Sequence, residues 1–231
     1  MAVQLRRTPG HLDRSRQVAP QIFETLRVRI LSLELKPNTL LSRAALQAEF
    51  GVSQTPVRDA LMRLEQEGLV EIYPQHATLV ARIDLRAARQ AHFLRLAIEL
   101  EAVRRVAAEH DSAFVPTLRQ AVDALRSSAD DYEAFAGADR AFHQLFYEAA
   151  GVPDLFHLVG RHSGHIDRLR RLNLPLPGKM EAVIRDHEAL VAAVARGDAE
   201  GAAAILRRHL SGTLSIVDQI RERHPDYFLP D

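Results

Sequence analysis

Four polar side chains in the second half of the sequence stand where a helical pattern predicts apolar, inward-facing residues. Asp139 and His143 are four residues apart, so they share one face of a helix that is rich in phenylalanine. His187 and His209 each lie in the middle of the apolar stripe of a later helix. Burying four polar groups without partners would cost several kcal/mol, so these residues are candidates for holding a ligand.

A divalent transition metal would satisfy all four groups at once. Neutral imidazoles and a carboxylate suit zinc, with nickel, manganese or iron as alternatives, better than magnesium or calcium. With five or six ligands, such a metal would keep open positions for an anion. From periodicity alone, a metal site and four separately hydrogen-bonded core groups are equally supported.

A second group of polar residues stands at the start of a helix in the segment GVSQTPVRDALMRLEQEGLV, residues 51–70. One face of this helix is apolar, and the other presents Gln54, Thr55 and Arg58 close to the helix N-terminus. In a major groove, Gln pairs with adenine, Arg with guanine or phosphate, and Thr with phosphate or the thymine methyl group. The alternative is a helical hairpin whose polar face is simply solvated.

The surrounding elements would position this helix for reading DNA. The pattern predicts a helix from residue 18, a short helix over 42–50 that Ser42 caps and Gly51 ends, and a helix over 54–67. The following segment LVEIYPQHATLVARI alternates around a polar tip, which predicts a two-stranded hairpin. Two short helices joined by a tight turn and followed by a hairpin form a winged helix-turn-helix.

The rest of the chain is predicted to be helical. We expect a mainly α protein, with the winged helix-turn-helix followed by an all-α antiparallel bundle of six to seven helices. Helices are predicted near residues 84–110, 112–128, 131–150, 152–172, 179–196 and 198–223. The corresponding domains are a disordered basic arm (1–17), a DNA-binding domain (18–82), an effector-binding helical domain (83–225) and a C-terminal tail (226–231).

Composition restricts the classes of function. The formal net charge is zero, but residues 1–82 contain 11 Lys and Arg against 8 Asp and Glu, which weakly favours an anionic partner for that part. The absence of cysteine excludes disulfides, thiolate metal sites and thiol nucleophiles. The sequence shows neither an apolar run long enough to span a membrane nor the apolar core of a signal peptide, so we expect a cytoplasmic protein that does not bind membranes.

Residues 51–70 closely resemble the DNA-binding signature of the GntR family of transcription regulators, within a resemblance that covers about residues 18–80. The resemblance implies that Ser53, Gln54, Thr55 and Arg58 contact DNA and that the region of His76 forms the wing tip. Some family members also contact DNA through an Arg of the preceding helix. Here that position is an alanine, and the adjacent Arg43 is the candidate.

About residues 84–223 resemble the FCD ligand-binding domain of the FadR subfamily, through the motifs RLAIELEA, DRAFH, DHEALVAAVARGD and RRHL in that order. The resemblance implies that Asp139, His143, His187 and His209 are the metal ligands. It also places Arg95 near an effector cavity, where a guanidinium would clamp a carboxylate. An i,i+4 salt bridge between Arg95 and Glu99 on the surface is the alternative.

Two further residues are candidates for binding the effector. His165 and Arg168 belong to the predicted helix over 152–172, and we expect them to line the same cavity as Arg95.

Together these features predict a DNA-binding regulator that binds double-stranded operator DNA as a homodimer. We expect a repressor, because repression is the commonest mode of action in such families. A small carboxylate effector held at the metal would control this binding. A metal-dependent hydrolase or lyase with an appended DNA-binding domain is the alternative, because an open metal position can activate water. Against this alternative, no spare carboxylate stands beside the four ligands as an obvious general base. A purely structural metal, without an effector, is a third interpretation.

Overall fold

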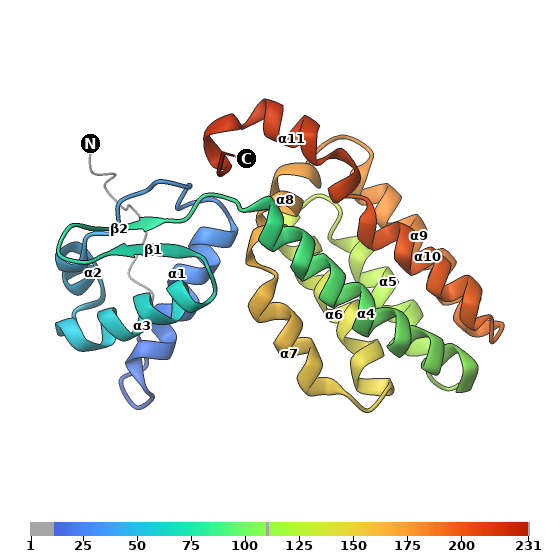
Figure 1. Ribbon diagram of the computed structural model, residues 1–231. Helices are drawn as coiled ribbons and strands as arrows, with labels where there is room; N and C mark the ends of the chain where they lie inside the picture. The colour runs from blue at the N-terminus through green and yellow to red at the C-terminus, as the bar shows by residue number, and fades with distance from the viewer. Residues whose placement is uncertain (1–11, 110, 231) are drawn as a thin grey trace. The chain divides into compact units, whose positions relative to one another are not determined.

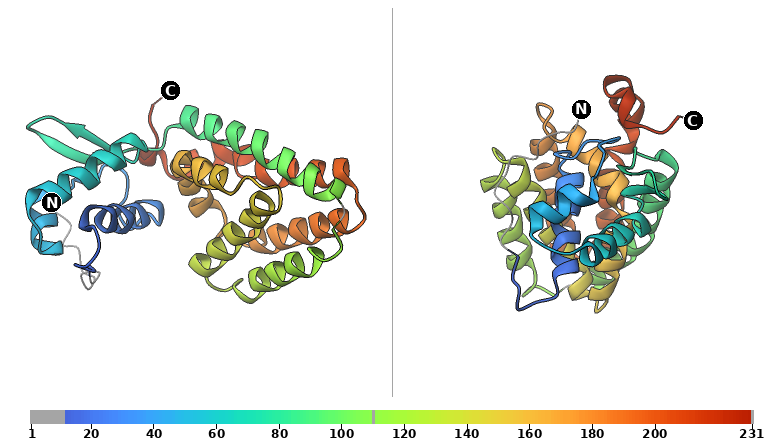
Figure 2. Two further views of the ribbon diagram at one scale, coloured as in Figure 1. Left: turned by 90° about the horizontal axis from the view of Figure 1, so that it is seen from below. Right: turned by 90° about the vertical axis from the view of Figure 1, so that its left-hand side faces the viewer.

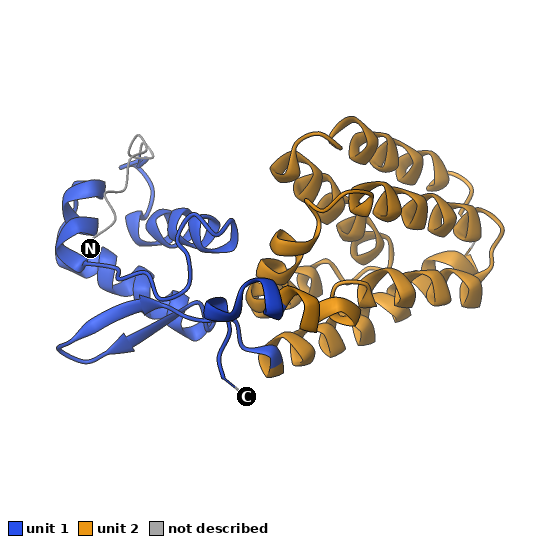
Figure 3. Cartoon of the chain, turned by 90° about the horizontal axis from the view of Figure 1, so that it is seen from above, with its two compact units in different colours: residues 1–85, 221–231 blue, residues 86–220 orange. Residues whose placement is uncertain are grey.

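The computed structural model describes residues 12–109 and 111–230, in which eleven α-helices and a two-stranded sheet are seen from three sides in Figures 1 and 2. These residues form two compact units (Figure 3). The first unit contains residues up to 85 together with those from 221 onward, and the second contains residues 86–220. Within the described residues, none of the helices has the length and apolar character that a membrane span requires.

The first unit is a winged helix-turn-helix. Its elements are α1 (Val18–Leu31), α2 (Arg43–Phe50), α3 (Gln54–Gln66), β1 (Val70–Tyr73) and β2 (Ala77–Val80). The hydroxyl of Ser42 accepts a hydrogen bond from the backbone N–H of Ala45, which satisfies one of the free donors at the start of α2. Gly51 ends that helix with φ of 63°, a left-handed conformation that glycine adopts without a Cβ penalty.

The core of the first unit follows the predicted apolar stripes. Each of the three helices buries one face in a single shared cluster. This packing holds α3 through its apolar face and leaves the opposite face of α3 exposed to solvent. The fully buried members of the helices are Ile22, Leu26 and Ile30 of α1, Leu46 of α2, and Val57, Ala60, Leu61 and Leu64 of α3. Strands β1 and β2 pair antiparallel with Val70 opposite Val80.

The two ends of the chain differ in part from the expected domain limits. Residues 1–11 of the expected basic arm lie outside the described residues. The rest of the arm is described, and within it the backbone N–H of Asp13 donates a hydrogen bond to the side chain of Gln21 at 2.8 Å. Residues 221–231 belong to the first unit and not to the helical domain. The reason is a short parallel bridge, in which Ile83 donates to the Tyr227 carbonyl at 2.7 Å and accepts from Leu229 at 3.0 Å.

The second unit is a helical bundle in which two of the predicted helices are each divided into two. Its elements are α4 (Leu85–Glu109), α5 (Val115–Ser127), α6 (Tyr132–Ala149), α7 (Pro153–His162), α8 (Gly164–Asn173), α9 (Lys179–Ala195), α10 (Ala199–Ser211) and the 3₁₀ turn η1 (Leu214–Ile216), which leads into α11 (Val217–Arg223). The expected single helices over 152–172 and 198–223 are therefore wrong.

The two breaks have local causes. The hydroxyl of Ser163 donates to the Val159 carbonyl at 2.8 Å, and the next residue is Gly164, so a competing hydrogen bond and a poor helix former coincide. At the second break, α10 ends before Gly212, where a glycine again lowers helix propensity.

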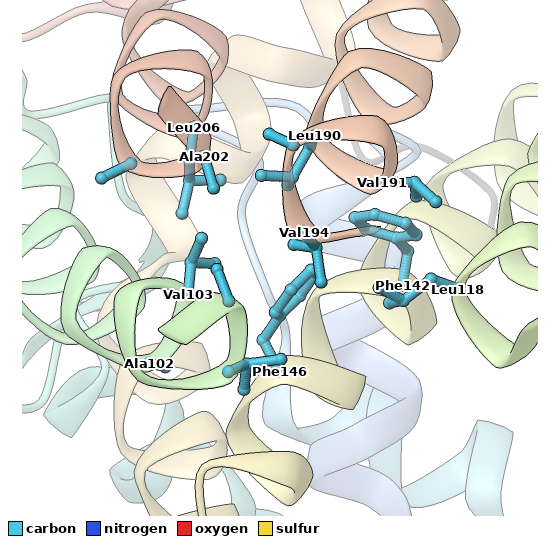
Figure 4. Packing of buried hydrophobic residues seen from close by; sticks show 14 of the residues in the cluster. Ala102, Val103, Leu118, Phe142, Phe146, Leu190, Val191, Val194, Ala202 and Leu206 are labelled. Atoms are coloured by element: carbon cyan, nitrogen blue, oxygen red, sulfur yellow. The ribbon is translucent and has the colours of Figure 1, made fainter. Parts of the chain in front are cut away.

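The core of the second unit joins helices that are far apart in the sequence. In Figure 4, Phe142 and Phe146 of α6 lie against Val191 and Val194 of α9, while Val103 of α4 faces the side chains of α10. Helices α9 and α10 pack along each other (Figure 1). This packing brings the inward faces of α6, α9 and α10 together, and those faces carry the four polar residues that the sequence singled out.

Candidate metal centre and nucleic-acid interface

The structure brings the four predicted metal ligands together. Asp139, His143, His187 and His209 each offer one ligand atom, and these four atoms all lie within 4.8 Å of one another. Asp139 Oδ1 is 3.4 Å from His187 Nε2 and 3.8 Å from His143 Nε2. The Nε2 atoms of His143 and His209 are 3.3 Å apart. Helix α6 supplies two of these residues because they are four positions apart, and α9 and α10 supply one each.

An acceptor faces the outer nitrogen of each imidazole. The distances from Nδ1 are 2.8 Å to Glu99 Oε2 for His143, 2.7 Å to the Val183 carbonyl for His187, and 3.6 Å to Asp186 Oδ2 for His209. An imidazole that donates from Nδ1 presents the lone pair of Nε2, which is the arrangement that surrounds metal-bound histidines in proteins. The Nε2 atoms of His143 and His187 therefore face the common centre in the form that can bind a cation, while Asp186 is the carboxylate nearest to Nδ1 of His209.

Two atoms at this centre are buried polar groups without a hydrogen-bond partner among the described residues, namely Asp139 Oδ1 and His187 Nε2. Both side chains are 1 % exposed, so water does not solvate them. A buried acceptor that stays unsatisfied costs roughly 1–3 kcal/mol. A divalent cation between the two atoms would remove this cost, so the donor set fits a metal.

The electrostatic surroundings hold the four residues in the protonation states that a metal requires. Burial lowers the pKa of His143 and His209, and it lowers the pKa of His187 to about 4. Burial alone would raise the pKa of Asp139, but the Arg170 guanidinium and the three imidazoles hold this pKa well below its usual range. At neutral pH the site therefore contains neutral imidazoles and an ionised carboxylate.

These pKa shifts predict how metal affinity depends on pH. Protons compete with the metal only below the pKa that each imidazole has in the folded, metal-free protein. Because these pKa values are lowered, zinc affinity should persist to a more acidic pH than ligands with the ordinary histidine pKa of about 6.5 would allow. It should be lost as the pH approaches the pKa of His187, which is about 4. Equilibrium dialysis with zinc at several pH values measures this. A steep loss of affinity already near pH 6.5 would contradict it.

Glu99, which orients His143, is itself held by two neighbours. It accepts hydrogen bonds from Arg95 Nε at 2.6 Å and from the Tyr147 hydroxyl at 3.1 Å. The side chains of Arg95 and Glu99 are only 11 % and 4 % exposed, so this i,i+4 pair is buried and does not form a surface salt bridge. The spacing was visible in the sequence, but its connection to His143 was not.

A cavity of about 220 Å³ opens beside the candidate metal centre, and His209 and Asp186 form part of its wall. Four cationic side chains line the same cavity, namely Arg95, Arg170, Lys179 and Arg208. Arg170 also donates to Asp139 Oδ2, so it links the carboxylate ligand to the cavity. Arg170 and Asp186 are not among the residues predicted from the sequence, although Asp186 directly precedes His187 in the motif DHEAL.

Two of the predicted effector-binding residues lie elsewhere. His165 and Arg168 are buried and do not belong to the described wall of this cavity. Arg168 Nη2 lies 3.0 Å from His165 Nδ1, so the two side chains contact each other, and burial lowers the pKa of Arg168 to about 10. The residues of α8 that line the cavity are Ile166, Arg170 and Asn173.

The predicted DNA-contacting residues lie on one exposed edge of the first unit. Ser53, Gln54, Thr55 and Arg58 are all exposed at the N-terminus of α3, and the Ser53 side chain makes no capping hydrogen bond. Free N–H groups at a helix N-terminus also attract phosphate. This edge has the donors and acceptors that reading a major groove requires.

The two remaining candidates occupy different positions. Arg43 is half-buried in the first turn of α2. His76 is exposed in the turn between β1 and β2, where Gln75 has φ of 60° and the His76 N–H donates to the Tyr73 carbonyl at 3.1 Å. His76 thus stands at the wing tip.

Comparisons with known proteins agree with both units. Residues 19–80 match the family model of bacterial regulatory proteins of the gntR family, and residues 90–212 match that of the FCD domain. An HTH-type transcriptional regulator in an unstable DNA locus of Streptomyces ambofaciens is 37 % identical over 210 residues, which are 91 % of this chain and 89 % of that protein. The HTH-type transcriptional repressor RspR of Escherichia coli K12 is 28 % identical over 219 residues, 94 % of this chain and 96 % of RspR.

A solved structure shares the fold. McbR/YncC of E. coli superposes with a TM-score of 0.71 at 23 % identity, over 87 % of this chain and 97 % of that one. The hydrolase or lyase alternative is therefore set aside, because the matched families and relatives are regulators and not enzymes. The chain belongs to the GntR family of DNA-binding transcriptional regulators, with a winged helix-turn-helix and an FCD domain.

Proposed function

We propose that this regulator binds operator DNA as a homodimer and represses transcription until a small organic acid binds beside a divalent metal in the second unit. The convergence of Asp139, His143, His187 and His209 next to a cationic cavity is the observation that carries the proposal. Zinc is the first candidate for the metal. The similarity to RspR, which is named a repressor, supports the sign of regulation.

DNA recognition would rest on the exposed edge of α3. Gln54 and Arg58 would contact base edges, while Ser53, Thr55 and the helix N-terminus would contact phosphates. Arg43 and His76 would add contacts from α2 and from the wing. One such unit reads few base pairs, so two copies on a near-palindromic site would supply the affinity and the specificity.

The chain's own residues would hold both metal and acid. Asp139 and the three imidazoles would bind the cation, with Glu99, the Val183 carbonyl and Asp186 fixing the orientation of the rings. A bound metal would supply a Lewis-acidic site for a carboxylate. Arg170, Arg95 and Lys179 on the cavity wall would attract and orient the acid, because guanidinium and ammonium groups pair with carboxylates.

Control of DNA binding requires two conformations of the protein, one with higher and one with lower affinity for the operator, and the acid must bind these two conformations with different affinity. The effect on operator affinity can be no larger than this difference. Residues that touch both the metal centre and the cavity, above all Arg170, would be the first to respond to the acid.

The proposal is tested by thermal unfolding with zinc and after EDTA treatment. We expect at least one small carboxylic acid, from a panel that includes acetate, lactate, malate, succinate and citrate, to raise the Tm of the zinc-loaded protein but not of the EDTA-treated protein. The same acid should release the full chain from a duplex selected out of a random DNA pool. Acids that stabilise both forms equally, or none at all, would refute metal-linked effector binding.

A further inference from the structure

Lys179 is a cation of the cavity wall whose ammonium group pairs with no carboxylate of residues 12–109 and 111–230. It is the first residue of α9 and lines the cavity together with Ala182, Val183 and Asp186. These four positions have the i, i+3, i+4 and i+7 spacing of one helix face, so this face of α9 is turned toward the cavity. Lys179 is half-buried, and the flexible four-carbon stem of a lysine lets its ammonium group turn toward a bound anion.

The arginines of the wall differ from Lys179, because each is already paired with a carboxylate of the metal centre. Arg170 donates to the ligand Asp139 itself. Arg95 Nε donates to Glu99 Oε1 at 2.6 Å. Glu99 Oε2 in turn lies 2.8 Å from Nδ1 of the ligand His143. Both guanidinium groups therefore support the metal centre as well as lining the cavity.

Arg208 is engaged in the same way on the opposite side of the centre. Its Nη2 donates to Asp186 Oδ1 at 2.7 Å, and Asp186 Oδ2 lies 3.6 Å from Nδ1 of His209. A guanidinium that is paired with a protein carboxylate has its charge compensated before any ligand arrives. The uncompensated charge of the wall is that of Lys179.

The charges of the metal-loaded centre would exceed what one carboxylate neutralises. The three arginines cancel the three carboxylates with which they pair. Asp167, which lies 4.0 Å from Arg170, has a second cation in Arg140 at 3.7 Å. A divalent metal would add two positive charges, and Lys179 adds a third. A monocarboxylate at the metal would leave Lys179 without a counter-ion, whereas a second carboxylate would supply one.

The size of the cavity is compatible with a small ligand that carries two acid groups. Its volume of about 220 Å³ lies below the roughly 300–1,000 Å³ of sites for drug-sized ligands. Lys179 supplies a single positive charge, which matches a carboxylate better than the charge of about −2 on a phosphate monoester.

We infer that Lys179 binds a second acid group, so that the ligand of this protein is a small dicarboxylate. The inference rests on the proposed function for the first carboxylate, which the metal would take. Lys179 then determines specificity, and the three arginines chiefly hold the residues of the metal centre in place.

The test compares each dicarboxylate with its half-amide, which has nearly the same shape but one negative charge fewer. The pairs are malonate and malonamate, succinate and succinamate, and glutarate and glutaramate. Isothermal titration calorimetry with the zinc-loaded full chain should show that, in at least one pair, the dicarboxylate binds roughly ten-fold or more tightly, as expected for a hydrogen bond between charged groups. Lys179→Met removes the charge but keeps an unbranched side chain. It should abolish this preference and leave the affinity for the half-amide within about two-fold.

The chain offers a matched control, because its only lysines are Lys36 and Lys179. Lys36 is exposed in the first unit, so Lys36→Met removes the same group and should leave the preference unchanged. A preference that arises from bidentate binding to zinc would survive in both variants.

The same two lysines allow a direct spectroscopic measurement on the native sequence. Reductive methylation with ¹³C-formaldehyde keeps the lysine charge and labels both side chains together with the terminal amine. The two Met variants assign the lysine signals. Adding the preferred dicarboxylate to the zinc-loaded protein should shift the NMR signal of Lys179 and not that of Lys36. This measurement decides the question if Lys179→Met does not fold.

Each outcome supports or overturns the inference. Equal binding within every pair, a preference that survives in Lys179→Met, or a Lys179 signal that does not respond to the dicarboxylate would overturn the second acid-binding position while leaving metal-linked binding of a carboxylate intact. Binding of no acid to the zinc-loaded protein would overturn the proposed function together with this inference.

Discussion

Replacing His187 with alanine should empty the metal site. The native chain, purified without an affinity tag, should contain about one metal ion per chain, and the variant should contain almost none. Because a bound metal stabilises the folded state in proportion to the logarithm of its excess over Kd, zinc at a thousand-fold excess should stabilise the native protein by about 4 kcal/mol. This gain should vanish in the variant. Elemental analysis and thermal unfolding with and without EDTA measure both quantities.

The comparison must separate metal loss from a packing defect. The His187 ring packs against Phe142 with centroids 4.3 Å apart, so its truncation also leaves a cavity. This cost is present with and without EDTA, whereas the metal contribution is the difference between the two measurements. His157→Ala removes an exposed imidazole of α7 and should keep both the metal and the zinc-dependent gain. Native protein that is metal-free and unaffected by EDTA would end the metal hypothesis.

Arg58→Ala should weaken operator binding by about ten- to hundred-fold while the protein stays folded. The Arg58 side chain is 61 % exposed, and its nearest described carboxylate is Asp59 at 3.9 Å, so it contributes little to stability and is available to DNA. Loss of a guanidinium that contacts a base edge costs about 1–3 kcal/mol. Fluorescence anisotropy of a labelled operator duplex at fixed salt measures the loss. If Arg58 contacts a phosphate instead, the salt dependence should decrease by about one ion.

The chain offers a closely matched control for this substitution. Arg105 of α4 is 60 % exposed and faces Glu109 at 3.0 Å, so Arg105→Ala removes the same charge at nearly the same exposure but in the second unit. Operator affinity should be unchanged in this variant. If Arg58→Ala binds within two-fold of the native chain, or if both variants lose affinity equally, α3 does not read DNA through this residue.

Features that depend on local spacing could be predicted correctly from the order of residues. The helical periodicity of apolar residues predicted α3, its buried apolar face and its exposed N-terminus, because a helix repeats every 3.6 residues and only one face can enter the core. Ser42 and Gly51 marked the ends of α2 through capping chemistry that involves near neighbours only. The i,i+4 spacing of Asp139 and His143 placed them on one face for the same reason.

Which groups meet across the bundle depends instead on the long-range packing of the helices. Helix packing brings His187 and His209 to Asp139, and it joins Glu99 to His143 across 44 residues of chain. Periodicity reports that a residue points inward but not which residue it faces. For this reason Arg170, which contacts Asp139 and lines the cavity, could not be found in the sequence.

Residues 152–172 illustrate the same limit. The sequence pattern predicts one continuous helix with His165 and Arg168 turned toward the cavity, whereas the structure has two helices, α7 and α8. Arg170 takes that position, and His165 and Arg168 are buried together. Local spacing thus specified the helices and their inward faces. Which inward-facing residues become neighbours in the site depends on packing between helices that are distant in the sequence, and a short stretch of sequence gives no information about that packing.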